Sequence, residues 1–544
     1  PTSSLPGQTE LSFRHALIRE VAYRSIPAPQ LAAAHASVGD WLAGLAGDRR
    51  VEFVELLAHH YEAGGEPVRA KAVAALIEAG DAARRRAASD DAVQFAGRAL
   101  ALATADADRL AALEVKARAL HAAVRADEAL GAYLDALALA HDEESAARLR
   151  AHAMLLCSRY PGAFTRRDWK PWAVAAIEDG LAGDAADRDT FEVGALLIGK
   201  ASMVRWYHLT DAEQATARAA AERAIEVAET IGSTRLLSHA LESLWWRDAD
   251  SGFCGAGATA DLMLELMKRM NDPVEGAETA VIAAVCLARS GRFADGRATA
   301  IDAVHVSRGL SPHRRLHAAS AMTVCLTPEG RFDELLEATQ HACEWAIQEG
   351  SRTCAMSSLA VAGYALAHFE CGDEAGGRRG ADLVEVTGMH RADSSFRYRG
   401  IELLRPFVGL AHTRHRMQAA DVARGLVDGV HHLRAALQLA ALDEDDEELD
   451  ALADRAREAA REACAPSVGW IADWAQAVRA GSLRRALAAT GALDLYGEHY
   501  TAARLEVDAI ARMPDAAAAT ATALRLEQMG ARASAAELSG IRGD

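Results

Sequence analysis

Three observations predict an all-α protein built from stacked helical hairpins. Ala, the best helix former, fills roughly a fifth or more of the chain, far above ordinary usage. Pro, the worst helix former, occurs only 13 times in 544 residues, and aromatic residues, which favour strands, make up 5%. Short turns with small residues recur between the helical stretches. This combination is typical of an α-solenoid, in which each hairpin packs mainly on its neighbours.

The recurring turns set the period of the array. Gly291, Gly330 and Gly372 each follow one apolar helix and precede another, and they lie 39 and then 42 residues apart. A small residue at such a turn lets two antiparallel helices approach closely. Because the period exceeds the 34 residues of a tetratricopeptide repeat and drifts, we expect degenerate tetratricopeptide-like hairpins wound into a superhelix.

Local signals place individual helices within this pattern. Ala217, Ala221, Ala224 and Ala228 recur at helical spacing. The helix that contains them follows Thr210–Glu213, which has the pattern of a capping box. Acidic or hydroxyl residues followed by Pro, at 272–273 and 311–312, predict two further helix starts. The one stretch that suggests a strand is short, around residues 10–13.

Composition and charge exclude several classes of protein. With 51% hydrophobic residues the chain is not intrinsically disordered. A net charge of −18 argues against nucleic acid or an anionic membrane as a partner. No uninterrupted apolar stretch predicts a membrane span, and no basic leader precedes an apolar segment. The eight cysteines form no CxxC pair, so we expect buried small hydrophobes in a reducing, cytoplasmic compartment.

Short segments near both ends carry a family resemblance. Near the start they are Phe13–Tyr23 with His35 and Trp41, then Glu55–Gly65, Ala79–Ala83 and Ala99–Leu102. Near the end they are Tyr500–Arg504 and Met529–Arg532. These segments resemble the winged-helix-like element and the flanking repeats of STAND-type signalling ATPases. Such ATPases are joined to class III adenylate cyclase or LuxR-type DNA-binding domains, mainly in actinobacteria and other bacteria.

The resemblance covers roughly the first 100 and last 50 residues, and the middle matches in helical character only. It implies that residues 1–48 are a winged-helix-like remnant with a linker helix. Residues 49–544 would then be the solenoid, in two halves with a break near 250–275. The first residue is Pro rather than Met, so we expect a piece of a longer protein whose ATPase module lies upstream. No helix-turn-helix follows Arg532, which favours the adenylate-cyclase type of arrangement.

The same resemblance implies a role for His15. In the intact protein it would sense the nucleotide phosphate, whereas in this chain it would do nothing detectable. The alternative is a histidine at a helix start, packed against Tyr23.

No catalytic, cofactor or metal site is predicted. Gly194–Ala201 resembles a phosphate-binding loop, but Ala201 replaces the required Ser or Thr and the flanks are helical. His313 and His317, and likewise His412 and His415, lie one helical turn apart, yet neither pair has an evident third ligand. The Arg- and His-rich segment 405–434 is expected to be a solvated helix face. We therefore expect no enzyme and no cofactor.

Aromatic residues suggest a partner-binding strip instead. They are scarce overall but cluster in three successive hairpins about one repeat apart, at Trp169, Trp172, Trp206, Tyr207, Trp245 and Trp246. Residues one repeat apart take equivalent places in a solenoid, so these rings could line its concave face. The alternative is that they fill the core.

These expectations combine into one prediction of function. The chain is predicted to be a non-catalytic regulatory or sensor repeat module of a multidomain signalling ATPase, which binds a protein partner or a small effector on its concave face. The alternative is a stand-alone α-helical enzyme or small-molecule-binding protein with its site in a groove.

Overall fold

The computed structural model describes residues 13–207, 210–251, 254–349, 354–386, 395–422, 429–443, 446–462 and 464–542. All regular structure in these ranges is helical, which confirms the predicted all-α class. Of the expected strand at 10–13 only Phe13 is described, and it lies in no regular element. Gly194–Ala201 lies within a helix, as predicted.

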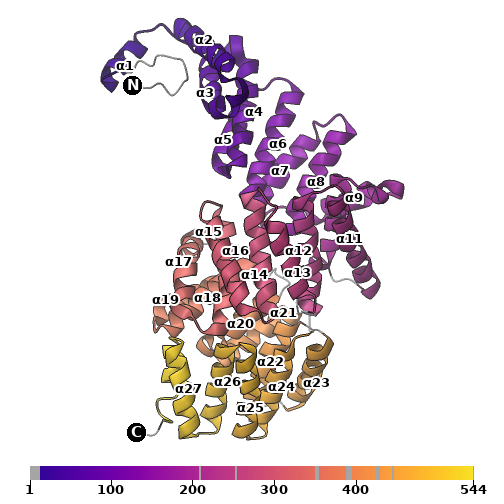
Figure 1. Cartoon of the computed structure of the whole chain (residues 1–544), viewed down its shortest axis with the longest axis vertical. Helices are drawn as coiled ribbons and strands as arrows, with labels where there is room; N and C mark the ends of the chain where they lie inside the picture. The colour runs from indigo at the N-terminus through magenta and orange to yellow at the C-terminus, as the bar shows by residue number, and fades with distance from the viewer. Residues whose placement is uncertain are drawn as a thin grey trace. The chain divides into compact units, whose positions relative to one another are not determined.

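The chain forms two compact units (Figure 1). The first comprises the chain up to Ala119 together with Ala132–Ala140, and the second comprises Leu120–Gly131 and everything from His141 onward. The expected winged-helix-like remnant at 1–48 and the break near 250–275 stay predictions. The first helices of the chain are α1 Ala16–Arg24, α2 Ala28–Ala46, α3 Arg50–Ala63, α4 Arg69–Arg85, α5 Ser89–Leu102, α6 Asp106–Ala122 and α7 Ala126–Leu137. Helices α6 and α7 each contribute residues to both units.

The second unit holds two series of helices that alternate along the chain. The inner series is α8 Glu143–Arg159, α10 Phe191–Ser202, α12 Thr234–Ser251, α14 Pro273–Arg289, α16 Pro312–Glu329, α18 Ala355–Glu370, α20 Ser395–Val408, α22 Val430–Asp443, α24 Pro466–Arg479 and α26 His499–Arg512. The outer series is α9 Lys170–Gly180, α11 Asp211–Thr230, α13 Ala256–Met267, α15 Phe293–Ser307, α17 Phe332–Glu349, α19 Glu374–Val386, α21 Leu410–Val422, α23 Asp446–Glu462, α25 Leu483–Tyr496 and α27 Ala516–Gln528, followed by the short α28 Arg532–Ala536. Successive inner helices from α14 to α24 pack against one another, and the outer helices pack between them on one side. This is the predicted tetratricopeptide-like α-solenoid.

Short 3₁₀ turns join several helices. They are Gly47–Arg49, Glu66–Val68, Pro161–Ala163, Gly183–Asp187 and Met203–Arg205. The predicted helix starts are confirmed where caps form. Thr210 and Glu213 make the expected capping box at α11, and the Asp272 side chain accepts hydrogen bonds from two amides of the first turn of α14.

The solenoid returns on itself, so that its last helices pack on its middle ones. Helix α26 contacts α16, and α28 contacts α18. At this junction the Tyr500 hydroxyl donates a 2.5 Å hydrogen bond to Glu370, and the Ser534 amide donates one of 3.0 Å to the same carboxylate. The predicted turn glycines meet this surface too. Gly330 has a left-handed φ of 71°, and a Cβ there would lie 2.7 Å from Met529.

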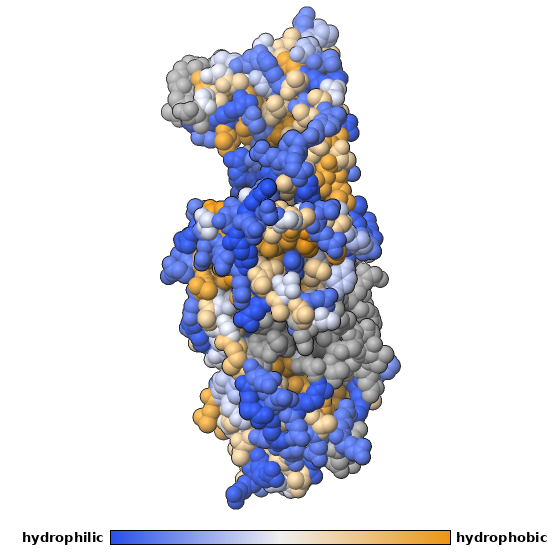
Figure 2. Space-filling view, turned by 90° about the vertical axis from the view of Figure 1, so that its right-hand side faces the viewer, coloured by the Kyte–Doolittle hydropathy of each residue, from blue (hydrophilic) through white to orange (hydrophobic). Residues whose placement is uncertain are grey.

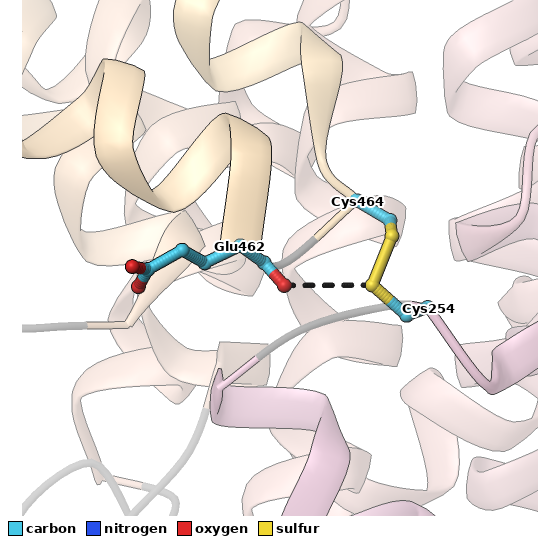
Figure 3. Close-up of a disulfide and its surroundings, with 3 residues drawn as sticks. All are labelled: Cys254, Glu462 and Cys464. Carbon is cyan, nitrogen blue, oxygen red and sulfur yellow. Dashed lines mark hydrogen bonds between the residues drawn. A yellow bond between two sulfur atoms is a disulfide. The ribbon is translucent and has the colours of Figure 1, made fainter.

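A disulfide links two segments that are 210 residues apart (Figure 3). Cys254 immediately precedes α13 and Cys464 precedes α24. The Cys254 Sγ lies 3.5 Å from the Glu462 carbonyl oxygen, a sulfur–oxygen contact, since a disulfide sulfur has no proton to donate. The expectation of eight buried free cysteines is therefore wrong for this pair, although Cys157, Cys286, Cys325 and Cys343 are buried free thiols. Because disulfides persist in oxidising surroundings, this bond does not support the expected reducing compartment.

Part of the Arg-rich segment 405–434 is also not the solvated face that was expected. Arg405 and Arg434 are 4% and 3% exposed, because carboxylates from other helices surround them. The face drawn in Figure 2 is mostly hydrophilic, with apolar residues in separate patches. Each described helix is either too short or too polar to cross a bilayer.

One close helix–helix approach yields a stability prediction. A Cβ at Gly363 in α18 would lie 2.3 Å from the hydroxyl of Thr323, a fully buried and stiff side chain of α16. We expect Gly363→Ala to lower the free energy of unfolding by about 1–3 kcal/mol in urea titrations, because the two helices must move apart. Gly491→Ala in α25, where a Cβ meets nothing within 4 Å, is the control and should stabilise by about 0.5–1 kcal/mol. A Gly363→Ala chain as stable as the parent would refute this packing.

Candidate functional site

The inner helices of the second unit line a pocket of about 60 Å³ that opens to solvent. We call it the inner pocket, and its lining residues are Ala288, Arg289, Phe293, Val324, Pro328, Leu359, Arg399, Val430, His431, Arg434, Ala465, Ser467, Tyr496 and Glu498. They come from α14, α16, α18, α20, α22 and α24 and from the ends of α15 and α25. Apolar and aromatic walls with a few convergent charged groups are typical of ligand sites.

Arg434 is fixed by partners from three directions. It makes a double hydrogen bond to Glu498, at 2.7 and 2.5 Å, and a 3.0 Å ion pair to Glu402. It also donates a 2.9 Å hydrogen bond to the Ser467 hydroxyl. Burial alone would raise the pKa of Glu498, but the Arg434 charge outweighs it and holds that pKa at about 2. The guanidinium and its carboxylates are therefore a permanently charged, rigid part of the pocket.

Two further arginines line the pocket. Arg399 pairs with Glu402 at 2.8 Å, and the Arg289 guanidinium lies 5.2 Å from the centre of the Trp245 ring. Burial, followed by the charges of Arg289 and Arg399, lowers the pKa of His431 well below its usual value, so this imidazole is neutral at pH 7. Three arginines, Arg289, Arg399 and Arg434, thus line a pocket in a chain whose net charge is −18.

A second polar assembly lies at the other end of α14 and α16. Arg159 donates hydrogen bonds of 2.6 Å to Glu242, 2.5 Å to Glu275 and 2.9 Å to Ser238. Arg314 pairs with Glu278 at 2.9 Å, and its guanidinium lies 5.3 Å from the centre of the Tyr160 ring. These groups are almost fully buried, so each charge depends on its partners.

Three potential metal ligands meet beside this network. His313 and His317 in the first turns of α16 and Cys354 at the start of α18 form what we call the His–His–Cys cluster. The His317 Nε2 lies 3.1 Å from the Cys354 Sγ, and its Nδ1 lies 3.0 Å from Glu278. Burial alone would lower the pKa of His317, but Glu278 and then Cys354 outweigh it and raise the pKa to about 10.

The two histidines in turn shift the pKa of the Cys354 thiol. Burial alone would raise the pKa of Cys354, but the charges of His317 and His313 outweigh it and lower the pKa well below its usual value. These shifts favour a thiolate next to an imidazolium. Such a pair can bind a soft metal ion or act as a nucleophile.

Two of the three residues of this cluster, His313 and His317, could be found from the sequence. The pattern of His313 and His317 predicted that both rings could face one way, and their centroids lie 4.6 Å apart. It missed Cys354 and Glu278, which stand 37 and 39 residues from His317. The available signal was that both separations equal about one repeat of the array. His412 and His415 are exposed on α21, and among the described residues no third ligand joins them.

The predicted aromatic residues occupy different environments. Trp169 and Trp206 are 5% and 3% exposed and contact each other edge to face with centroids 4.8 Å apart. Trp245 is 2% exposed. Trp172 is half-buried and Tyr207 is 40% exposed, beneath the ammonium group of Lys170. The side chain of Trp246 lies outside the described residues, so the six-residue binding strip stays a prediction.

His15 lies just before the first turn of α1 and is exposed. Its side chain makes no capping hydrogen bond. The ring of Tyr23, its expected neighbour, meets the ring of His35 with centroids 5.8 Å apart. The nucleotide-sensing role of His15 stays a prediction.

Comparisons with known proteins report only distant likeness. No family model matches the chain, and no curated protein matches it. Among solved structures, the APC/C hetero-tetramer Cut9–Hcn1 is 12% identical over 96% of this chain and 94% of that one, with a TM-score of 0.49. A Rap protein complexed with competence and sporulation factor is 13% identical over 79% and 95%, with a TM-score of 0.29. These values are too low for the likeness to bear on function.

Proposed function

We propose that the chain is a regulatory binding module that takes an anionic effector in the inner pocket. The observation that carries this proposal is that three guanidinium groups, those of Arg289, Arg399 and Arg434, line this pocket in a strongly acidic chain. The binding chemistry is recognition of a carboxylate by guanidinium groups, a bidentate match that fixes orientation as well as affinity. A free carboxylate metabolite and the C-terminus of a peptide share this chemistry.

The shape of the pocket supports an effector with an apolar body. Phe293 and Tyr496 meet edge to face, with centroids 6.2 Å apart, and Val324 and Leu359 of neighbouring helices complete the apolar wall. Arg289, Arg399 and Arg434 line the pocket, and we expect an incoming carboxylate to join the ion pairs that Arg399 and Arg434 already make. A pre-formed wall of this kind loses little entropy on binding.

A second part of the proposal concerns an ATPase module joined to this chain. The segments Phe13–Tyr23 and Glu55–Gly65 resemble those that follow the ATPase of STAND-type regulators. We propose that occupancy of the inner pocket biases such an ATPase, encoded upstream of Pro1. A reading frame there without a phosphate-binding loop would contradict this part alone and leave the binding proposal standing.

The binding proposal is tested with two peptide pools and one set of small molecules. Random pentapeptides with free C-termini, the same pool as C-terminal amides, and simple aryl carboxylates are compared by thermal shift and calorimetry. We expect saturable binding of carboxylate forms and not of amides, and the small-molecule arm identifies which source of carboxylate fits better. Equal responses to acid and amide pools, or binding only of single-stranded RNA, would contradict the proposal.

A substitution that fills the pocket sharpens this test. Val324→Trp on α16 projects a large ring into the inner pocket and is expected to weaken carboxylate binding at least about 10-fold, or about 1.4 kcal/mol. Val306→Trp on the outer helix α15, where Val306 is 42% exposed, is the matched control and should bind like the parent. Arg289→Gln should weaken binding without filling the pocket. Unchanged affinity in both pocket variants would contradict carboxylate binding in the inner pocket.

A second candidate function rests on the arrangement of Cys354, His317 and Glu278, in which the histidine contacts both the thiol and the carboxylate. A thiolate oriented by a histidine that a carboxylate holds in turn is the arrangement of a nucleophilic enzyme. This corresponds to the alternative of a helical enzyme with a groove site. The thiol-reactivity experiment described below separates it from metal binding at the same atoms.

A further inference from the structure

The donor atoms of the His–His–Cys cluster are already close to a metal-binding arrangement. One potential ligand atom from each of His313, His317 and Cys354 lies within 4.8 Å of the others. Ligand atoms around a tetrahedral zinc ion stand about 3.3–3.8 Å apart, given bond lengths of about 2.0–2.3 Å. Small side-chain rotations therefore suffice to bring all three donors onto one ion.

The surroundings orient these donors as metal sites require. A histidine that binds a metal donates its other ring N–H to a carboxylate or carbonyl in most known sites. Here Glu278 lies 3.0 Å from the His317 Nδ1 and is itself held by Arg314 at 2.9 Å. The Tyr160 ring contacts both histidines, with its centroid 6.1 Å from each. The cluster is thus supported from α14 and from the end of α8.

One donor has an unmet requirement for a partner. The Nε2 of His313 is buried and makes no hydrogen bond with any described residue. Leaving a buried polar atom without a partner is unfavourable, and a bound ion would supply that partner. The donor set also selects the kind of ion. One thiolate and two imidazoles favour zinc and related transition metals over magnesium or calcium, which prefer oxygen ligands.

We propose that His313, His317 and Cys354 bind a zinc-like divalent transition-metal ion, with Glu278 positioning His317. Three protein ligands leave a fourth position for water or for a donor atom of a ligand, as in open rather than purely structural zinc sites. His317 lies seven residues, about two helical turns, from Val324 on the same helix. The metal site and the inner pocket are therefore separate sites on α16.

Cobalt titration of the intact, metal-stripped chain tests the proposal. We expect one equivalent of Co²⁺ to give the visible bands of a tetrahedral site and a thiolate charge-transfer band, both displaced by Zn²⁺. Cys354→Ser should remove the charge-transfer band, and His313→Gln should weaken binding at least about 10-fold. Cys371→Ser, which removes a half-buried free thiol at the end of α18, is the control and should keep both bands. Circular dichroism confirms that each variant is folded.

Alkylation separates a metal ligand from a nucleophile. We expect one equivalent of Zn²⁺ to protect Cys354 from iodoacetamide, with the modified cysteine located by peptide mass mapping. Rapid alkylation of Cys354 that Zn²⁺ does not slow, or cobalt bands that survive in Cys354→Ser, would overturn the metal proposal. The first of these results would favour the nucleophilic role.

Discussion

Replacing Arg434 with Met is expected to lower the free energy of unfolding by about 3–5 kcal/mol at pH 7. The guanidinium is 3% exposed and neutralises Glu402 and Glu498, which are 6% and 5% exposed. Without it, Glu498 stays buried without its main counter-charge, and Glu402 keeps only the ion pair with Arg399. Chemical denaturation of the variant and the parent measures this loss. Arg378→Met is the matched control, because Arg378 pairs with Glu374 on the surface of α19, and the loss there should stay below about 1 kcal/mol.

The pH dependence of this effect has a definite sign. Glu498 has a depressed pKa of about 2, so its contribution to stability is full above the unfolded value near 4.5 and is lost as the pH falls toward 2. In the variant the two carboxylates are expected to take up protons at higher pH, which relieves their burial. The stability difference between parent and variant should therefore begin to narrow as the pH falls through the raised pKa of the variant's carboxylates, and go on narrowing toward pH 2. A difference independent of pH would show that lost packing, not lost charge, causes the defect.

Removing the disulfide is expected to have an effect of similar size. The bond between Cys254 and Cys464 closes a loop of 210 residues in the unfolded chain. In the chain-entropy model a loop of that length corresponds to about 5 kcal/mol of stabilisation, and less where the unfolded chain keeps structure. We expect the double variant Cys254→Ser with Cys464→Ser to unfold at correspondingly lower denaturant concentration. Dithiothreitol should lower the midpoint of the parent and leave that of the double variant unchanged; equal shifts in both would contradict a structural role.

The sequence predicted what short stretches of chain determine. The turns at Gly291, Gly330 and Gly372 and the caps at Thr210 and Asp272 follow from residues within one helix end. Backbone preference and helix periodicity act over a few residues, so these features are legible without a structure.

What the sequence did not predict depends on the return of the solenoid on itself. Glu370 becomes buried because Tyr500 and Ser534, from 130 and 164 residues away, pack over it. Arg434 was expected in solvent, since local sequence does not show that Glu498, 64 residues along the chain, packs against it. The same holds for Cys354 in the His–His–Cys cluster, which joins His317 across one repeat. Helical period alone does not fix how many hairpins make one superhelical turn, and that number decides which distant charges meet.

The most direct test of the inner pocket as a carboxylate-binding site is an anomalous-scattering map. Crystals of the chain would be soaked with 4-bromobenzoate, whose bromine reports the position of the ring and whose carboxylate supplies the proposed binding group. We expect a bromine peak against Phe293 and Tyr496, with the carboxylate density facing Arg289 and Arg399. Bromine peaks confined to the outer helices, with the inner pocket empty, would contradict it.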